Sequence, residues 1–264
     1  MRIRTNRILH SSVLSLILFC MAVGTLSTSC EAKVKRYSLE VVAKYFHDEK
    51  SYTQGLFFHD GVMYESTGQW GESTLRTVDL TTGKPIINQN FPKKYFLEGS
   101  CIFDGKLYLL TWTNKLAFVY DPQTLEYRRT LSYPREGWGL TTDGKQLIAS
   151  DGSANLYFLD GDLKEKKRVT VKLNGRPLKY LNELEWIDGK VWANVYTTDL
   201  IAIIDPSTGN VEATVDCTGL LPKELRDNRT DVLNGIAYNP ADRKIYLTGK
   251  YWKRLYEIRL VEKN

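Results

Sequence analysis

The feature that most constrains this chain is one position that returns about every 40–50 residues at the start of a predicted strand. The position is followed each time by Gly or Glu and then by an apolar run. Its five occupants, at spacings of 44, 40, 44 and 52 residues, are Gln54, Glu98, Trp138, Asn182 and Asn234. Self-similarity at this period is typical of repeat architectures, in which each repeat is one structural unit. The chain is therefore predicted to contain five similar units.

Two turn signals recur in phase with this position. Asp-Gly pairs separate neighbouring apolar runs in four units, at 60–61, 104–105, 143–144 and 188–189, and the fifth unit has a looser turn at 241–244. Asp-Gly is a strong hairpin signal because Gly accepts the positive φ of a type I′ turn. A second aspartate follows a later strand of four units, at Asp79, Asp121, Asp160 and Asp205. Each unit is thus predicted to have four strands; in the first they cover 54–58, 62–66, 75–80 and 85–91.

No fourth strand is predicted in the fifth unit, whose last strand runs out over 260–264. The alternating stretch at about 37–45 stands just before the first unit and can supply the missing strand. Closing a ring in this way removes the open edges of a linear array. The high aromatic content, 12%, also favours strands. The predicted fold is an all-β, five-bladed β-propeller over residues 31–264, a single domain whose last blade is completed by the N-terminal strand.

Residues 1–30 are predicted to be an export signal. Arg2, Arg4 and Arg7 precede an apolar segment at 13–23, which is too short to span a membrane. The small residues before Cys30, in LSTSC, resemble a loose bacterial lipobox. Two alternatives stay open: lipidation of Cys30, which would attach the protein to a membrane in the periplasm or cell envelope, and simple secretion.

Composition argues against several classes of partner. Residues 1–29 hold three Arg and no acidic residue, so their removal lowers the formal net charge from +5 to about +2, and no basic run interleaved with aromatic residues remains. A nucleic-acid partner is therefore not expected. Of the three histidines, His10 leaves with the export segment, and His47 and His59 have no Cys or His neighbour at ligand spacing, so neither a metal nor another cofactor is expected. Cys101 and Cys217 are expected to be buried thiols, with a disulfide as the alternative.

In a propeller the innermost strands converge, so the five recurring residues are expected to surround one mouth of the central axis. Residues at nearby strand ends join them: Tyr52, Phe96, Trp112, Tyr196, Lys250 and Trp252. The expected site is a small aromatic bowl with one carboxylate, one ammonium group and several amides. Glu98 is the only carboxylate among the five and is the candidate acid–base residue. Glu183 and Glu185 compete with it as acids.

Nine short motifs occur in order over residues 51–252: SYTQGL, YFLEGS, LTW, GWGL, SDGS, LNELEW, VWANVY, DVLNGIAY and TGKYW. Together they resemble the plant and bacterial type of glutaminyl cyclase, of the glutamine cyclotransferase family. The resemblance implies a five-bladed propeller with metal-free chemistry. It also implies an acyltransferase that converts the N-terminal glutamine of peptides or proteins to pyroglutamate and releases ammonia.

The resemblance also implies roles for individual residues. The acid–base residue is Glu98, and Lys250 is a second catalytic residue. The aromatic pocket is formed by Phe96, Trp112 and Trp138, and the substrate-orienting polar residues are Gln54 and Asn182. Whether Lys250 or Asn182 stabilises the oxyanion stays open.

Two positions depart from the motifs of this family. Tyr196 and Tyr52 keep the aromatic ring of the substrate pocket but add a hydroxyl. Pocket polarity and substrate range are therefore in question more than the reaction itself.

A second class of function also explains the fold and export. It is a non-enzymatic exported propeller that binds a peptide or glycan at its mouth, and it does not require Glu98 together with Lys250. A metal-dependent hydrolase or lyase is disfavoured by the few histidines. The default assembly is a monomer.

Overall fold

The computed structural model describes residues 33–263. These residues form β-strands, turns and one short 3-10 helix, so the predicted all-β class is confirmed. The predicted export segment, 1–30, and Cys30 lie outside the described residues. Within the described range there is no helix with the length and apolar character that crossing a membrane requires.

Most strands form antiparallel groups of four that follow chain order. The first group is β2 (Thr53–His59), β3 (Val62–Thr67), β4 (Thr74–Asp79) and β5 (Lys84–Asn90). The second is β6 (Leu97–Phe103), β7 (Lys106–Thr111), β8 (Leu116–Tyr120) and β9 (Tyr127–Ser132). The third is β10 (Leu140–Thr142), β11 (Leu147–Ala149), β12 (Asn155–Leu159) and β13 (Glu165–Thr170). A small hairpin follows, β14 (Lys172–Leu173) with β15 (Arg176–Pro177).

The remaining strands form one eight-stranded sheet with the order β16-β17-β18-β19-β1-β22-β21-β20. Its first half is β16 (Leu181–Ile187), β17 (Lys190–Val195), β18 (Leu200–Ile204) and β19 (Val211–Asp216). Its second half is β1 (Lys35–Phe46), β22 (Arg254–Glu262), β21 (Lys244–Gly249) and β20 (Leu233–Asn239). A strand from each end of the described chain therefore lies in the same sheet.

The pairing of β1 covers two strand edges at once. It runs antiparallel to β22 from Tyr37, opposite Glu262, to Phe46, opposite Arg254. Its first residues, from Lys35, also pair in parallel with β19. The alternating segment predicted at 37–45 is thus a strand, and it leaves neither β19 nor β22 as a free edge along these residues.

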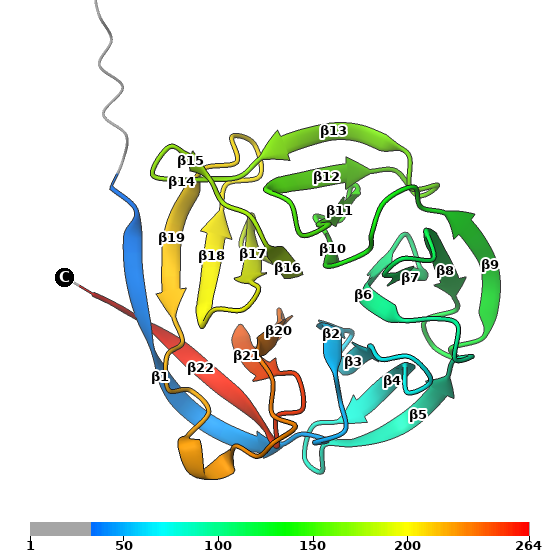
Figure 1. Ribbon diagram of the computed structural model, residues 1–264, viewed down its shortest axis with the longest axis horizontal. Coiled ribbons are helices and arrows are strands. Elements are labelled where there is room, and N and C mark those ends of the chain that lie inside the picture. The colour runs from blue at the N-terminus through cyan, green and yellow to red at the C-terminus, as the bar shows by residue number, and fades with distance from the viewer. Residues whose placement is uncertain (1–32, 264) are drawn as a thin grey trace, which may run out of the picture. The chain divides into compact units, whose positions relative to one another are not determined.

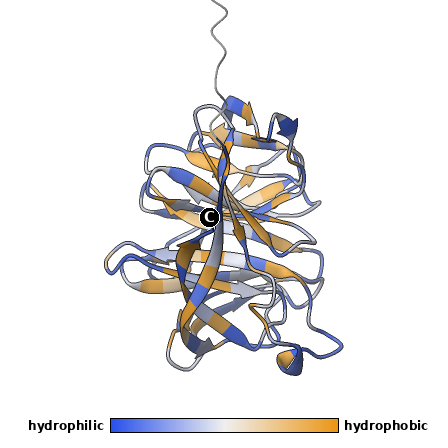
Figure 2. Cartoon of the chain, turned by 90° about the vertical axis from the view of Figure 1, so that its left-hand side faces the viewer, coloured by the Kyte–Doolittle hydropathy of each residue, from blue (hydrophilic) through white to orange (hydrophobic). Residues whose placement is uncertain are grey.

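Five strands form an inner ring. They are β2, β6, β10, β16 and β20, and each contacts the next, with β20 contacting β2 (Figure 1). Since neighbouring sheets cover both of their faces, these strands are buried almost throughout instead of alternating. The outer strands β5 and β9 are mostly exposed. Hydrophobic side chains fill the space between adjacent sheets, as where Phe57 and Tyr64 pack with Ile102, and Figure 2 shows hydrophobic segments within the strands.

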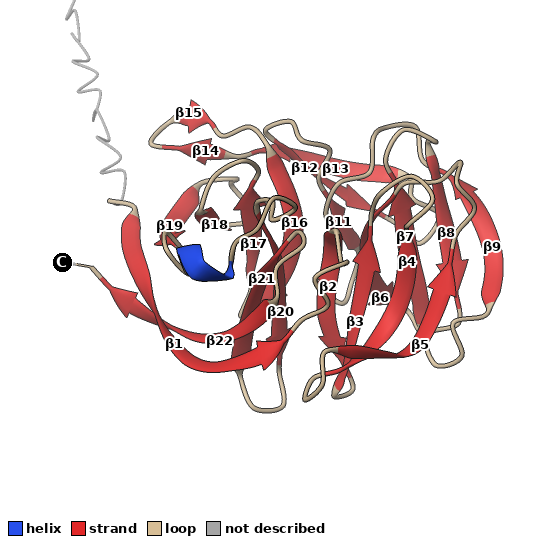
Figure 3. Ribbon diagram, turned by 60° about the horizontal axis from the view of Figure 1, so that its bottom comes forward, coloured by secondary structure: helices blue, strands red, loops and turns tan. Residues whose placement is uncertain are grey.

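Two local features complete the description. The outer strand of the third group, β13, ends at Thr170, and the Val171 N–H bonds to the Ala154 carbonyl before the chain enters β14. The 3-10 helix η1 (Lys223–Leu225) is the only helix in the described range (Figure 3). Cys101 and Cys217 are free and buried, as the thiol interpretation predicted.

Candidate functional site

Four of the five ring residues lie at interruptions in the inner strands, and the fifth, Trp138, lies just before β10. Strand register shifts between Thr53 and Gly55, between Leu97 and Ser100, between Leu181 and Leu184, and between Leu233 and Ile236. These shifts enclose Gln54, Glu98, Asn182 and Asn234. A bulge leaves its extra residue out of the ladder and re-aims the side chain, and such bulges are common next to active sites.

Close packing between neighbouring inner strands explains the glycine that follows most ring residues. A Cβ on Gly55 would lie 2.7 Å from the Ser100 nitrogen, and a Cβ on Gly99 would lie 2.5 Å from the Leu140 nitrogen. Real Cβ atoms do not approach backbone this closely, so any larger residue would push the strands apart. The recurrence seen in the sequence therefore has a packing cause.

Gln54 connects the acidic and basic residues of the site. Its Nε2 donates to Glu98 Oε1 at 3.0 Å, and its Oε1 accepts from Lys250 Nζ at 2.6 Å and from Asn234 Nδ2 at 3.3 Å. Since the ammonium and the Asn amide are donors, they fix which end of the Gln54 amide faces Glu98. The structure thus brings four predicted ring-mouth residues into one hydrogen-bonded group.

Burial sets the proton affinities in this group. Glu98 is 4% exposed, and burial raises the pKa of its carboxyl well above the ordinary value, opposed by the Lys250 charge and assisted by Glu136. Lys250 is 1% exposed, and burial lowers its pKa to about 8, opposed by Glu98 and Asp231. The physical cause in both cases is that a low-polarity site disfavours the charged form. Perturbed groups of this kind cluster at functional sites.

Two tyrosines compensate part of the cost of burying Lys250. Its Nζ lies 4.2 Å from the ring centroid of Tyr52 and 5.5 Å from that of Tyr196. An ammonium over an aromatic face is attracted by the ring quadrupole. The two positions that depart from the family motifs thus both contact the buried ammonium, through ring faces that their hydroxyls leave in place.

The remaining aromatic residues form two linked groups. Phe96 packs edge-on against Tyr52 at 5.9 Å and against Trp112 at 5.4 Å, measured between ring centroids. Trp138 packs edge-on against Tyr196 at 5.5 Å. Phe96 is buried, whereas both tryptophans are half-buried and border the mouth. All the predicted aromatic pocket residues therefore lie around the same mouth.

Asn182 offers unused hydrogen-bonding capacity. It is 3% exposed, and its Oδ1 has no hydrogen-bond partner within residues 33–263. A buried amide with a free acceptor is uncommon in a folded protein. This is the property expected of a side chain that binds a substrate.

Three residues at the mouth were not found from the sequence. Glu136 accepts hydrogen bonds from the indoles of Trp112 and Trp138. Trp70, 48% exposed, packs against Phe96 and Trp112 and extends the aromatic surface outward. Neither residue recurs in phase with the ring position, and Asp231, near Lys250, has no sequence signal either. Trp252, which was expected at the bowl, is instead buried in the core against Tyr256.

The competing acids have structural partners. Glu183 reaches across the ring centre, where its carboxylate accepts the backbone N–H of Leu56 at 3.3 Å and of Ile236 at 2.9 Å. Glu185 accepts the Tyr238 N–H at 2.9 Å. These two carboxyl groups link the inner strands by accepting hydrogen bonds from backbone N–H groups. Glu98 instead accepts its hydrogen bond from the side chain of Gln54.

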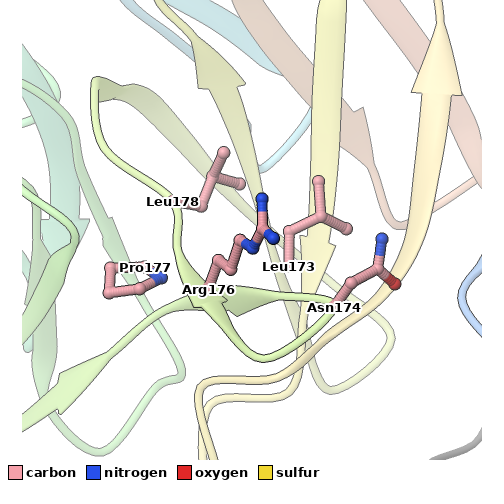
Figure 4. A pocket seen from close by; sticks show the side chains of 5 residues that line it. All are labelled: Leu173, Asn174, Arg176, Pro177 and Leu178. Carbon is pink, nitrogen blue, oxygen red and sulfur yellow. The ribbon is translucent and has the colours of Figure 1, made fainter.

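Two other kinds of candidate site, a metal centre and the cavity at the β14–β15 hairpin, lack this chemistry in the described part of the chain. No group of three or more His, Cys, Asp or Glu among residues 33–263 is arranged to hold a metal ion. A cavity of about 460 Å³ lies at the β14–β15 hairpin (Figure 4). Its lining contains one charged residue, Arg176, and no ring residue. The ring mouth is therefore the candidate active site.

Comparisons with known proteins cover the whole of this site. A family model described as glutamine cyclotransferase matches residues 13–260. A glutaminyl-peptide cyclotransferase from Arabidopsis thaliana is 39% identical over 227 residues, 84% of this chain and 71% of the plant protein. The crystal structure of Myxococcus xanthus glutaminyl cyclase matches with a TM-score of 0.82 at 35% identity, over 88% of this chain and 100% of that chain.

Proposed function

The chain belongs to the glutamine cyclotransferase family, and we propose that it converts the N-terminal glutamine of peptides or proteins to pyroglutamate with release of ammonia. The observation that carries this proposal is the buried group of Glu98, Gln54 and Lys250 inside a ring of aromatic side chains. It places an acid–base carboxylate where an apolar wall can hold a glutamine side chain.

The reaction needs one proton to move twice. The α-amine nitrogen attacks the γ-carbonyl carbon, the new C–N bond closes the ring, and Glu98 takes a proton from that nitrogen. The tetrahedral intermediate then breaks its bond to the amide nitrogen, which receives the proton from Glu98 and leaves as ammonia. A carboxyl whose pKa burial raises is suited to both steps, because it can hold the proton between them.

The residues around Glu98 position its carboxylate and the substrate, and they stabilise the oxyanion. Gln54 holds the Glu98 carboxylate, and the aromatic walls fold the substrate side chain back on its own amine. The free Oδ1 of Asn182 can accept a substrate N–H. The ammonium of Lys250 is the stronger candidate to stabilise the oxyanion, since it is charged and buried. No step in this scheme requires a metal.

We interpret the groups of four strands as the blades of a five-bladed β-propeller whose last blade is β20, β21, β22 and β1. The closed contacts of the inner strands and the pairing of β1 with β22 support it.

We also propose that the protein is an exported monomer and that residues 1–30 direct its export. Lipidation of Cys30 and simple secretion are the two alternatives for its destination. Loss of membrane fractionation in Cys30→Ser would support lipidation, and unchanged fractionation would reject it.

The experiment that tests the function is turnover of short peptides that begin with Gln, Asn or Glu, with a chelator present. The proposal expects ammonia release and a product lighter by one ammonia from the Gln peptide only. Binding of the Gln peptide without ammonia release would identify the alternative, a binding propeller. Activity that disappears on chelation and returns with added metal would reject the metal-free scheme.

A further inference from the structure

Glu136 is the second carboxylate at the mouth, and it lies on the connection between β9 and β10. Its Oε2 accepts the indole N–H of Trp112 at 2.9 Å and that of Trp138 at 3.2 Å. The two tryptophans come from different sheets, one just after β7 and the other just before β10. One carboxylate oxygen therefore connects two aromatic walls of the site.

The backbone around Glu136 is fixed from three sides. The Tyr133 N–H bonds to the Lys115 carbonyl at 2.9 Å, and the Gly137 N–H bonds to the Thr111 carbonyl at 3.1 Å. The Trp138 N–H bonds to the Ser150 carbonyl at 3.3 Å. These bonds hold the connection against both the second and the third group of strands, so the position of Glu136 is determined by the fold.

The neighbouring cation does not neutralise Glu136. Arg135 instead bonds to Glu165 at 2.6 Å and stacks on the ring of Tyr157 at 4.0 Å. Glu136 forms no ion pair within residues 33–263. Its side chain is exposed, yet both of its hydrogen bonds go to half-buried indoles. An indole N–H can only donate, and a partly buried one normally has an acceptor.

We propose that Glu136 is a positioning residue of the cyclotransferase site, which holds Trp112 and Trp138 as a preformed pocket for the substrate glutamine. The proposal rests on the proposed function. Without the carboxylate, each indole loses its acceptor and gains rotational freedom, and the substrate must order both rings when it binds. The cost of ordering side chains on binding lowers affinity.

The charge of Glu136 has a separate effect. It acts in the same direction as burial on the Glu98 carboxyl, raising its pKa. Glu136→Gln keeps an oxygen that can accept an indole N–H but removes the charge, whereas Glu136→Ala removes both. The two variants therefore separate positioning from electrostatics.

The test compares steady-state kinetics of wild type, Glu136→Ala and Glu136→Gln on a Gln peptide over a range of pH. Glu136→Ala is expected to raise KM about tenfold with a smaller change in kcat. Glu136→Gln is expected to keep KM within about threefold and to move the pH limb that reports Glu98 to lower pH. Glu126→Gln, an exposed carboxylate on the turn before β9, is the matched charge control and should change neither.

A second set of variants tests whether Glu136 acts through the indole N–H groups. In Trp112→Phe/Trp138→Phe the rings carry no N–H, so adding Glu136→Ala should leave KM unchanged within about twofold. An equal KM effect in both backgrounds, or a KM within twofold of wild type for Glu136→Ala alone, would overturn the proposal. Tryptophan emission is independent of turnover and should change in Glu136→Ala but not in Glu126→Gln; unchanged emission would also count against the positioning role. Absence of ammonia release in the wild type would reject the proposed function and leave the emission test standing.

Discussion

Two buried carboxylates, Glu65 on β3 and Glu98 on β6, have opposite surroundings. Glu65, 1% exposed, accepts hydrogen bonds from Thr53 at 2.7 Å and from Arg76 Nε at 2.9 Å, and it lies 3.0 Å from His47 Nε2. Glu98, 4% exposed, accepts one side-chain hydrogen bond from the described residues, that of Gln54. Burial raises the pKa of both, but Arg76 and His47 reverse the direction for Glu65, so its pKa is lowered.

The difference separates a structural carboxylate from a reactive one. Arg76 also binds Asp48, so the Glu65 cluster joins the segment after β1 to the first group of strands. Its carboxylate has hydrogen bonds on both oxygens and stays ionised. Glu98 keeps unused acceptor capacity and a high proton affinity, which are the properties that proton transfer requires.

The largest expected effect is on Glu98. Glu98→Gln should lower kcat by about 10²–10⁴ because the proton acceptor is lost. The free energy of unfolding should stay equal or rise, since the substitution removes a carboxyl that burial makes costly to ionise. Ammonia release and urea denaturation measure the two quantities. A variant that loses stability along with activity would make Glu98 structural and remove the contrast.

The reverse result is expected for Glu65. Glu65→Gln should lower the free energy of unfolding by about 3–5 kcal/mol, because Arg76 then keeps its buried charge without its main partner. The turnover of the molecules that remain folded should change by less than about tenfold. Urea denaturation checks the stability, and Glu72→Gln, an exposed carboxylate, is the control. A loss no larger than the control's would contradict the structural role.

The role of the Lys250 charge can be tested by the dependence of kcat on pH. Its pKa of about 8 means that its charge is lost as the pH rises through that value. If the charged form stabilises the oxyanion, kcat should fall above about pH 8, and Lys250→Met should lower kcat by about 10²–10³ and abolish this limb. A pH–rate profile of the wild type and of Lys250→Met measures whether this limb is present. Retention of the limb in Lys250→Met would assign it to another group.

The smallest expected effect concerns Glu183, which is buried like Glu98 but bonded to backbone. Its pKa is raised to about 8, so its contribution to stability is present below the unfolded value of about 4.5 and is lost as the pH rises through 8. The Glu65 contribution has the opposite sign, since its pKa is lowered, and is lost as the pH falls. Glu183→Gln should cost about 1–3 kcal/mol at pH 5 and flatten the decline toward pH 8. Urea denaturation at several pH values measures this, and an unchanged slope would exclude Glu183 as its source.

Much of this arrangement was predictable from the sequence. The period of the ring position and the Asp-Gly turns predicted units of four strands, and the first unit was predicted to within one residue at every strand end. The recurrence also placed Gln54, Glu98 and Asn234 at one mouth, because residues in phase with a repeat occupy equivalent positions. The spacing of residues along the chain was therefore enough to predict the strand units and the ring position.

What the sequence determined is the all-β class, the strand units and the identity of the ring residues, since these follow from hydrophobic period and turn chemistry. Only the tertiary structure decided which carboxylate has a raised pKa, because Arg76 and Glu65, or Gln54 and Glu98, meet through folding. It also decided the place of Glu136, whose contact with Trp112 and Trp138 spans two groups of strands. Hydrogen bonds and charge interactions depend on distance in space, and no periodic pattern in the chain records that distance.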